Sequence, residues 1–600
     1  MSGQPAGTTD DGDARVAAPY EEADAIFHGG EIVTATADSR ESDPRPEAVA
    51  VKDGVIVHVG DHQEAVERWQ GPRTRVRDLG GRALLPGFID AHGHLGGIGL
   101  QATLANLLAD PDGDVTDLAS LREKLRAWAR TPVGAASKWI IGFGYDDAML
   151  AEGRHPTRED LDEVSTTRPV LAIHQSFHLG AVNSLGLREL GYTKATADPD
   201  GGVIRRRTDP IDRPFGEPNG VLEETAFSPA SEMATAGLPL TALAALFSKG
   251  IASAASFGFT TVQEGGATLK NLKALRGAAA LVPFKIDVVA YARADEATAS
   301  PEPDPVGASQ DYKRGVRAAG VKMYLDGSPQ GRTAWLTEPY EERPENTPEG
   351  YRGYPTIEDP KVVLDQVRTA YAKGWQVLAH VNGDAAIDQF VEAVEAAAEE
   401  AGPGDRRTVA IHAQTAREDQ IDDFARLGVI PSFFSMHTFY WGDWYRKTVL
   451  GEERAATISP ARWAVDRQMV YTSHHDAPVA LPDSIAILSS QVTRRTRTDR
   501  VVLGPEQRVS ALDAVKSITI HAAHQYFEQD RKGSIEVGKL ADLVILSANP
   551  LTVPPEEIRD IEVAETIKRG TTIHSAAGAA TDDTGTGLEV PTDYQWHGCC

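Results

Sequence analysis

Apolar, strand-like runs alternate with amphipathic helical stretches through most of the chain. This alternation is typical of repeated β-α units and a parallel sheet. Eight runs are candidate barrel strands, at residues 83–92, 259–264, 284–291, 321–326, 376–380, 408–412, 429–434 and 470–474. Because eight parallel strands close a (β/α)8 barrel, the pattern predicts an α/β fold with a TIM-like barrel over residues 83–530.

The spacing of these runs also predicts the other parts of the chain. More than 160 residues separate the first two runs, so we expect a large insertion after strand one, at about residues 95–240. Short alternating runs with turn signals, in residues 23–82 and 531–575, predict one small β-sandwich built from both chain ends. The polar segments 1–22 and 576–600 are expected to be tails, the first of them disordered.

Composition narrows the functional class. The formal charge of −27, from 87 acidic and 60 basic residues, disfavours nucleic acid and anionic membranes as partners. Neither a secretory signal nor a membrane-spanning run is readable, so a cytoplasmic enzyme is the expectation. The two cysteines, Cys599 and Cys600, are adjacent at the end of the sequence. A metal in the core would therefore need His, Asp, Glu or Lys ligands.

The first apolar run ends in three polar residues at a spacing of two, Asp90, His92 and His94. A strand would aim their side chains to one side of a sheet, where two neutral imidazoles can reach one metal ion. Gly93 between them leaves the approach uncrowded. The alternative interpretation is a pair of polar histidines at a strand-to-loop junction.

Four other predicted strands also carry a potential ligand. Runs 376–380 and 408–412 end in His380 and His412, and Asp476 follows run 470–474. Taken singly, each residue has an alternative interpretation: a hydrogen-bonded histidine at a strand end, or an aspartate that caps a loop. Lys322 stands inside an apolar run, where a buried ammonium is costly unless it is paired or neutralised. A lysine with a lowered pKa can react with carbon dioxide, and the resulting carbamate is an anionic oxygen ligand.

This ordered set resembles the binuclear site of the metal-dependent amidohydrolase superfamily. Within it the chain is similar to the YtcJ-like group, also called amidohydrolase family 3, over about residues 23–574. The motifs that carry the resemblance are residues 85–94 (LPGFIDAHGH), 219–224 (NGVLEE), 321–328 (VKMYLDGS) and 541–546 (ADLVIL). The resemblance implies that His92, His94 and Asp476 hold a buried metal, and that His380 and His412 hold a more exposed one.

The same resemblance implies the cofactors. We expect two divalent ions, bridged by a CO2-derived carbamate on Lys322. Zinc is the expected metal because all the ligand atoms are nitrogen or oxygen. A homo-oligomer, namely a dimer, is also expected.

Six further positions are candidate substrate-binding residues: His178, Arg332, Trp335, His437, Tyr440 and Trp441. Relatives place a histidine facing the metals where His178 stands, although a packing role in the insertion is the alternative. Arg332 and Trp335 belong to a long polar loop after strand four. The alternative interpretation of this loop is a solvated crossover. After strand seven, an aromatic cluster is formed by His437, Tyr440 and Trp441. We expect it to line an apolar substrate pocket, and the alternative is simple packing under the loop.

Together these patterns predict hydrolysis of an amide-type C–N bond in a small-molecule substrate, with Asp476 as the general base. Residues 432–443 and 473–479 are most similar to the N-substituted formamide deformylase branch, although His474 and His475 stand where relatives often have small residues. The alternatives are a hydrolase of N-acyl amino acids, carbamates or esters, a mononuclear deaminase, or a scaffold descended from hydrolases. A deaminase would leave Lys322 without a role, and no Gly-x-Ser-x-Gly motif supports a serine hydrolase.

Overall fold

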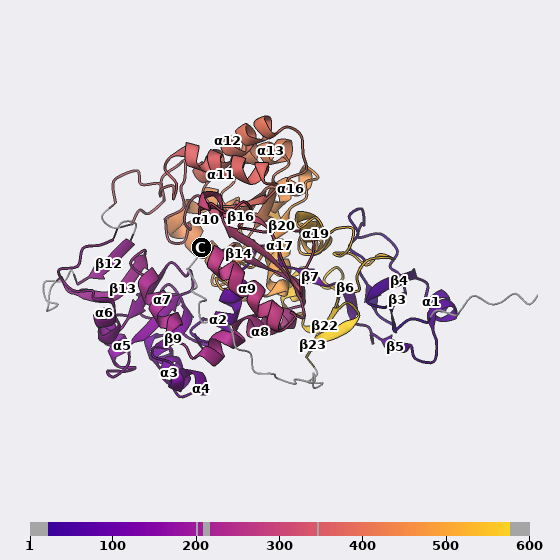
Figure 1. Ribbon diagram of the computed structural model, residues 1–600, viewed down its shortest axis with the longest axis horizontal. Helices are drawn as coiled ribbons and strands as arrows, with labels where there is room; N and C mark the ends of the chain where they lie inside the picture. The colour runs from indigo at the N-terminus through magenta and orange to yellow at the C-terminus, as the bar shows by residue number, and fades with distance from the viewer. Residues whose placement is uncertain (1–21, 200–201, 208–215, 345–346, 577–600) are drawn as a thin grey trace, which may run out of the picture.

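The computed structural model describes residues 22–199, 202–207, 216–344 and 347–576. Its centre is an eight-stranded parallel sheet to which each predicted run contributes one strand, in sequence order. The strands are β7 (Phe88–Ile89), β14 (Phe259–Ala267), β15 (Asp287–Arg293), β16 (Val316–Tyr324), β17 (Gln376–Val381), β18 (Val409–His412), β19 (Ile430–Phe433) and β20 (Thr472–Ser473). Helices that connect the strands lie around the sheet (Figure 1).

These helices follow the β-α alternation expected from the sequence. They are α8 (Leu240–Ser256), α9 (Leu269–Leu281), α10 (Ala294–Ala299), α11 (Pro360–Ala372), α12 (Asp384–Ala401), α13 (Glu418–Leu427), α14 (His437–Trp444), α15 (Gly451–Ala456), α16 (Ala461–Asp466), α17 (Ser484–Thr493), α18 (Ala511–Ser517) and α19 (Ile520–Gln525). The loops after the first and last strands are joined by backbone hydrogen bonds. Asp476 N donates to His92 O at 3.2 Å, and His94 N donates to Ala477 O at 3.0 Å. The sheet is thus curled as in a TIM-like barrel, and the carboxyl ends of its strands face one mouth.

The predicted first strand, residues 83–92, is in fact two strands in two sheets. β6 (Ala83–Pro86) pairs with β21 (Leu543–Leu546) outside the barrel, and only β7 joins the barrel. The chain changes sheets at Pro86-Gly87, because proline cannot donate a ladder hydrogen bond and Gly87 passes very close to Thr260. A Cβ on Gly87 would lie 2.4 Å from Thr260 Cγ2.

Strand four also differs from its prediction, because β16 begins at Val316 rather than at Val321. The residues of β16 that the prediction omits include Arg317, and a charged side chain is not typical of a buried strand. Arg317 is nevertheless buried, and its Nε lies 3.1 Å from Glu528 Oε1. A partner 211 residues away in sequence therefore compensates a burial that the local pattern argues against.

Residues between strands one and two form a separate six-stranded sheet, in the order β12-β13-β11-β10-β9-β8. Its strands are β8 (Ala105–Asn106), β9 (Ile140–Tyr145), β10 (Val170–His174), β11 (Leu179–Val182), β12 (Gly202–Arg206) and β13 (Pro218–Glu224). The helices of this region are α2 (Leu95–Gln101), α3 (Leu118–Trp128), α4 (Pro132–Ala136), α5 (Arg158–Asp162), α6 (Ser184–Leu190) and α7 (Ser228–Ala236). This sheet lies at the left of Figure 1, beside the barrel.

Two smaller sheets are built from the chain ends. One has the order β4-β3-β1-β5 and the other β2-β6-β21-β22-β23. Their elements are β1 (Ala25–His28), β2 (Glu31–Ile32), β3 (Ala48–Lys52), β4 (Val55–Gly60), α1 (His62–Trp69), β5 (Arg75–Asp78), β22 (Val563–Lys568) and β23 (Thr571–Ser575), besides β6 and β21. Phe27 and Val49 of the first sheet share one hydrophobic cluster with Leu84 and Leu543 of the second.

Two predictions concern segments at the chain ends. The tails 1–22 and 576–600, with the cysteine pair in the second, fall outside the described residues except for positions 22 and 576.

Among the helices that the structure describes, none combines the length and the apolar character needed to cross a bilayer.

Candidate metal centre and active site

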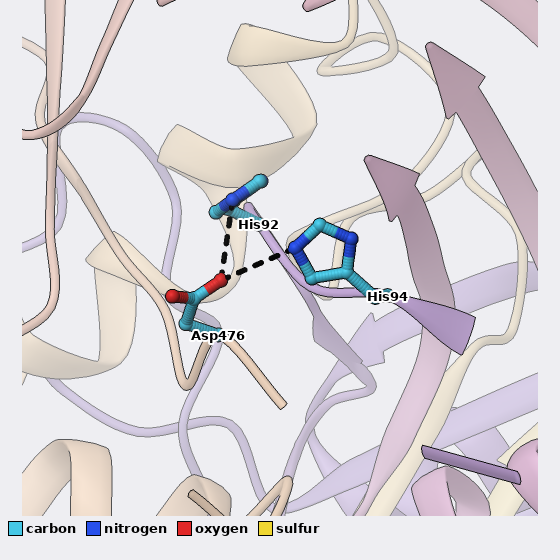
Figure 2. A group of neighbouring side chains, drawn as sticks. All are labelled: His92, His94 and Asp476. Carbon is cyan, nitrogen blue, oxygen red and sulfur yellow. Dashed lines mark ion pairs between the residues drawn. The ribbon is translucent and has the colours of Figure 1, made fainter. Parts of the chain in front are cut away.

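Three predicted metal ligands converge at the barrel mouth. His92 and His94 follow β7 and Asp476 follows β20, so the hydrogen bonds between these two loops bring them together. Asp476 Oδ1 lies 3.3 Å from His92 Nε2 and 3.5 Å from His94 Nε2. Both imidazoles are turned toward the carboxylate (Figure 2). Three nitrogen and oxygen donors at these separations can share one divalent ion.

The remaining three predicted ligands adjoin this group. Lys322 Nζ lies 2.9 Å from His92 Nε2, and His412 Nε2 lies 3.8 Å from Asp476 Oδ2. The ring centroids of His380 and His412 are 4.6 Å apart. All six side chains are at most 3% exposed, so the positions assigned to the two metals are equally buried. The structure thus brings two predicted ligands from the first barrel strand, and one from each of four other strands, into a single connected group.

The protonation states of these groups suit a metal centre. Burial, reinforced by the nearby Lys322 charge, lowers the pKa of His92 to about 4 and that of His380 to about 3. Burial also holds the pKa of His412 well below its usual value. Burial alone would raise the pKa of Asp476, but hydrogen bonds from His92 and His94 outweigh it and keep that pKa low. Neutral imidazoles and an ionised carboxylate are the ligand forms that a divalent cation binds.

Polar neighbours orient two of the histidine rings. Gln263 Oε1 lies 2.6 Å from His92 Nδ1, which leaves Nε2 for the centre of the group. His474 Nε2 lies 3.2 Å from His412 Nδ1, and Ser432 Oγ is 3.0 Å from the other nitrogen of His474. Such contacts fix the tautomer and orientation of metal-binding imidazoles. Gln263 and Ser432 are not among the residues predicted from the sequence, where their only signal is that they stand near the ends of barrel strands.

One closely packed glycine and two left-handed backbone conformations shape the site. A Cβ on Gly93 would lie 2.7 Å from both Asp90 Oδ2 and His475 Cε1, so glycine is required by the packing behind the ligands rather than by the metal approach. Asp476 and His412 have φ angles of 52° and 70°, in the left-handed region. Such conformations cost of order 1–3 kcal/mol each and persist where the surrounding structure imposes them, commonly at functional sites.

A cavity of about 760 Å³ opens beside this group, between the six-stranded sheet and the loop after β16. Lys322 and Asp326 line it from the barrel, and His178 and Glu224 line it from the side of the six-stranded sheet. His178 Nδ1 lies 2.9 Å from Glu224 Oε2. Burial would lower the pKa of His178, but the charges of Glu224 and Asp476 raise it above its usual value. Among the predicted substrate residues, His178 therefore lies on the cavity wall.

The loop after β16 places its two predicted residues differently. The Arg332 guanidinium stacks over the Trp444 ring at 5.1 Å and lies 3.7 Å from Glu342. Trp335 contributes through its backbone, because its N–H donates to Asp326 Oδ2 at 3.1 Å. This bond and two from residues 382 and 383 hold the Asp326 carboxylate next to His380. A substrate contact for Arg332 or Trp335 stays a prediction.

The aromatic cluster after strand seven lies on α14 and packs toward the ligands. The His437 ring is 4.2 Å from that of Phe434 and 6.1 Å from that of His412. Trp441 packs on His437 at 5.6 Å. Tyr440 instead donates its hydroxyl to Asp112 of the inserted region. The helix thus links the metal-ligand group to the insertion.

A second group of possible metal ligands lies in the inserted region, formed by Asp146, Asp147 and His174. His174 Nε2 is 3.2 Å from Asp147 Oδ1, and Asp146 Oδ2 is 3.4 Å from Arg497. His174 Nδ1 accepts from Ser176 N at 3.0 Å. These bonds account for the group as a polar network between the insertion and the barrel.

Comparisons with known proteins agree with this geometry. The amidohydrolase family model matches residues 75–574. The putative amidohydrolase YtcJ of Bacillus subtilis (strain 168) is 28% identical over 566 residues, which cover 92% of this chain and 99% of that protein. The N-substituted formamide deformylase of Arthrobacter pascens is 27% identical over 559 residues, covering 91% and 97%.

A solved structure shows the same fold. The crystal structure of an uncharacterised metal-dependent hydrolase from Pyrococcus furiosus is similar at a TM-score of 0.67 and 24% identity, covering 88% of this chain and 100% of that one. The family match extends over most of the chain and includes β6 and β21, which pair beside the barrel. The chain therefore belongs to the amidohydrolase family, in the YtcJ-like group of the metal-dependent amidohydrolase superfamily.

Proposed function

We propose that this protein is a binuclear, zinc-dependent hydrolase that cleaves the C–N bond of an N-substituted formamide or a related amide. The observation that supports it most is the connected group of six buried ligands at the barrel mouth, beside a cavity of about 760 Å³. Divalent ions held by this group would activate a water molecule and polarise the scissile carbonyl.

The side chains of this chain move the protons. Asp476 accepts a proton as the water oxygen adds to the carbonyl carbon, and it passes that proton to the nitrogen as the C–N bond breaks. The products are an amine and a carboxylic acid, which releases its remaining proton at neutral pH. Burial of the ligand group keeps bulk water from competing for these transfers, and a carbamate formed on Lys322 would remove its positive charge from the centre.

The cavity wall supports an apolar amine portion of the substrate. Phe177 and Phe227 line it from the insertion, and Met323 and Ile357 line it from the barrel and its loop. Aromatic and aliphatic side chains of this kind are usual where a site binds the apolar part of a ligand, and the polar side chains of the same wall can hold its polar part. In this proposal, residues 95–240 are an inserted subdomain that shapes the cavity, and the two sheets from the chain ends form a β-sandwich that supports the barrel.

Metal content tests the binuclear assignment. We expect about two zinc ions per fully active chain, because six ligands are enough for two sites. Elemental analysis of protein loaded with zinc and then desalted measures this ratio alongside activity. Full activity at one ion or fewer per chain would favour a mononuclear enzyme such as a deaminase.

A substrate screen tests the reaction. Zinc-loaded protein is expected to hydrolyse N-benzylformamide faster than N-acyl amino acids, anilides, carbamates or esters, because a formyl group is small and Phe177, Phe227 and Met323 give the cavity wall an apolar part. Release of formate and benzylamine is measured directly. If formamides are inert while N-acyl amino acids are hydrolysed, the formamide assignment is wrong, although the hydrolase assignment stands.

A further inference from the structure

The inserted sheet holds one pair of side chains in a fixed relation to each other at the cavity wall. His178 directly precedes β11, and Glu224 is the last residue of β13. These strands pair antiparallel with Leu179 opposite Glu223, and Glu224 N donates to His178 O at 2.7 Å. The backbone register therefore places the Glu224 carboxylate beside the His178 ring, 2.9 Å from Nδ1.

Glu224 is built into this position. Its φ angle of 50° lies in the left-handed region, which costs energy for a glutamate and turns the side chain out of the regular strand pattern. The adjacent Glu223 instead forms an ion pair with Arg205 of the neighbouring strand β12. Two consecutive glutamates on one strand thus serve different partners.

The second ring nitrogen of His178 lacks a hydrogen-bond partner among the residues that the structure describes. His178 Nε2 is buried and makes no hydrogen bond within the described parts of the chain. Because Nδ1 is bound by Glu224, Nε2 is on the opposite side of the ring, and the residue shares its cavity with Lys322 and Asp326. A buried polar atom without a partner is rare in native structures, and at a cavity wall it indicates a bond that forms when ligand binds.

We propose that Glu224 is a positioning residue that orients His178 and stabilises its imidazolium form, so that His178 Nε2–H donates to the substrate carbonyl oxygen as negative charge develops on it. This proposal rests on the proposed amide hydrolysis and adds a catalytic role for His178. A carboxylate on one imidazole nitrogen favours a proton on the other, because its charge offsets that of the ring. A donor held in place before the reaction stabilises the transition state more than the substrate.

Four single variants and one double variant test the pair. Glu224→Gln and His178→Gln are expected to lower kcat about 10²-fold, the usual loss for one oxyanion donor, with little change in KM. Glu223→Gln is the matched control and is expected to retain native kinetics. The double variant is expected to lose no more than either single one, because the two residues act as a unit. Glu224→Asp, which keeps the charge, is expected to recover part of the loss.

Binding provides a readout besides turnover. Calorimetry with a phosphonamidate analogue of the hydrolysed amide, whose anionic oxygens mimic the tetrahedral state, is expected to show about the same loss of affinity in Glu224→Gln as kcat/KM does. Binding of the product amine and the zinc content are expected to stay unchanged. Native kcat and analogue affinity in Glu224→Gln would overturn the proposal, as would native behaviour of His178→Gln when Glu224→Gln is impaired.

The outcome is separable from that of the proposed function. If the native protein hydrolyses no compound in the screen, amide hydrolysis fails as the function. The analogue can still be titrated into zinc-loaded native and Glu224→Gln protein, and equal affinities would reject the positioning role independently. If Glu224→Gln does not fold, as judged by circular dichroism, the comparison between His178→Gln and Glu223→Gln decides, and native kcat in both rejects the proposal.

Discussion

Replacing Lys322 by alanine is expected to remove the metal ions and abolish hydrolysis. Lys322 is 1% exposed, and its Nζ lies 2.9 Å from His92 Nε2 within the ligand group. An unmodified ammonium there would repel two dications, whereas a carbamate carries negative charge and two oxygens. Short-chain carboxylates in the buffer are expected to restore part of both metal content and activity in Lys322→Ala, because they can occupy the position of the bridge.

Two further variants sharpen this test. Lys322→Arg is expected to stay inactive with carboxylates, since arginine keeps its charge and fills the space. Lys361→Ala, at a lysine whose side chain is 71% exposed, is the matched control and should behave as native protein. Elemental analysis and turnover are measured on each. A crystal structure with two bound metals beside an unmodified Lys322 amine would contradict the carbamate.

Asp476→Asn is expected to keep the fold but to lower kcat by about 10²–10⁴-fold, the range that general acid–base groups contribute. The Asp476 carboxylate lies within 3.5 Å of His92 Nε2 and His94 Nε2, and these contacts keep its pKa low. An amide can neither accept the water proton nor replace an anionic ligand in full. Turnover, zinc content and circular dichroism are measured together.

The control for Asp476→Asn is the same change at an exposed site. Asp114 pairs with Lys124 at the surface, where its side chain is 73% exposed, and Asp114→Asn is expected to retain native turnover. Near-native activity in Asp476→Asn with both metals bound would remove Asp476 from the role of general base. Loss of metal together with activity would identify it as a ligand without separating the two roles, and the proton transfer would then be tested in Asp476→Glu.

Local pattern was enough to single out five of the six predicted ligands, because each of these five stands at or just after the end of an apolar run. Lys322 is singled out instead as a charged residue inside such a run. His92, His380 and His412 follow short buried segments, and parallel strands deliver their carboxyl ends to one edge. Local pattern failed where a residue's environment depends on distant partners. Arg317 lies inside a barrel strand because Glu528 compensates its charge, and β6 leaves the barrel because β21 pairs with it.

The sequence by itself determined the fold class, which follows from strand periodicity, and indicated the family through the resemblance of its motifs. It also gave the order of the predicted ligands along the chain. Only the tertiary structure decided which atoms meet. It brings Lys322 to His92 across 230 positions, sets Gln263 behind His92, and pairs His178 with Glu224 across the inserted sheet. Contacts of this kind depend on strand register and sheet closure, which place residues far apart in sequence within a few ångströms and leave no periodic signal in either segment.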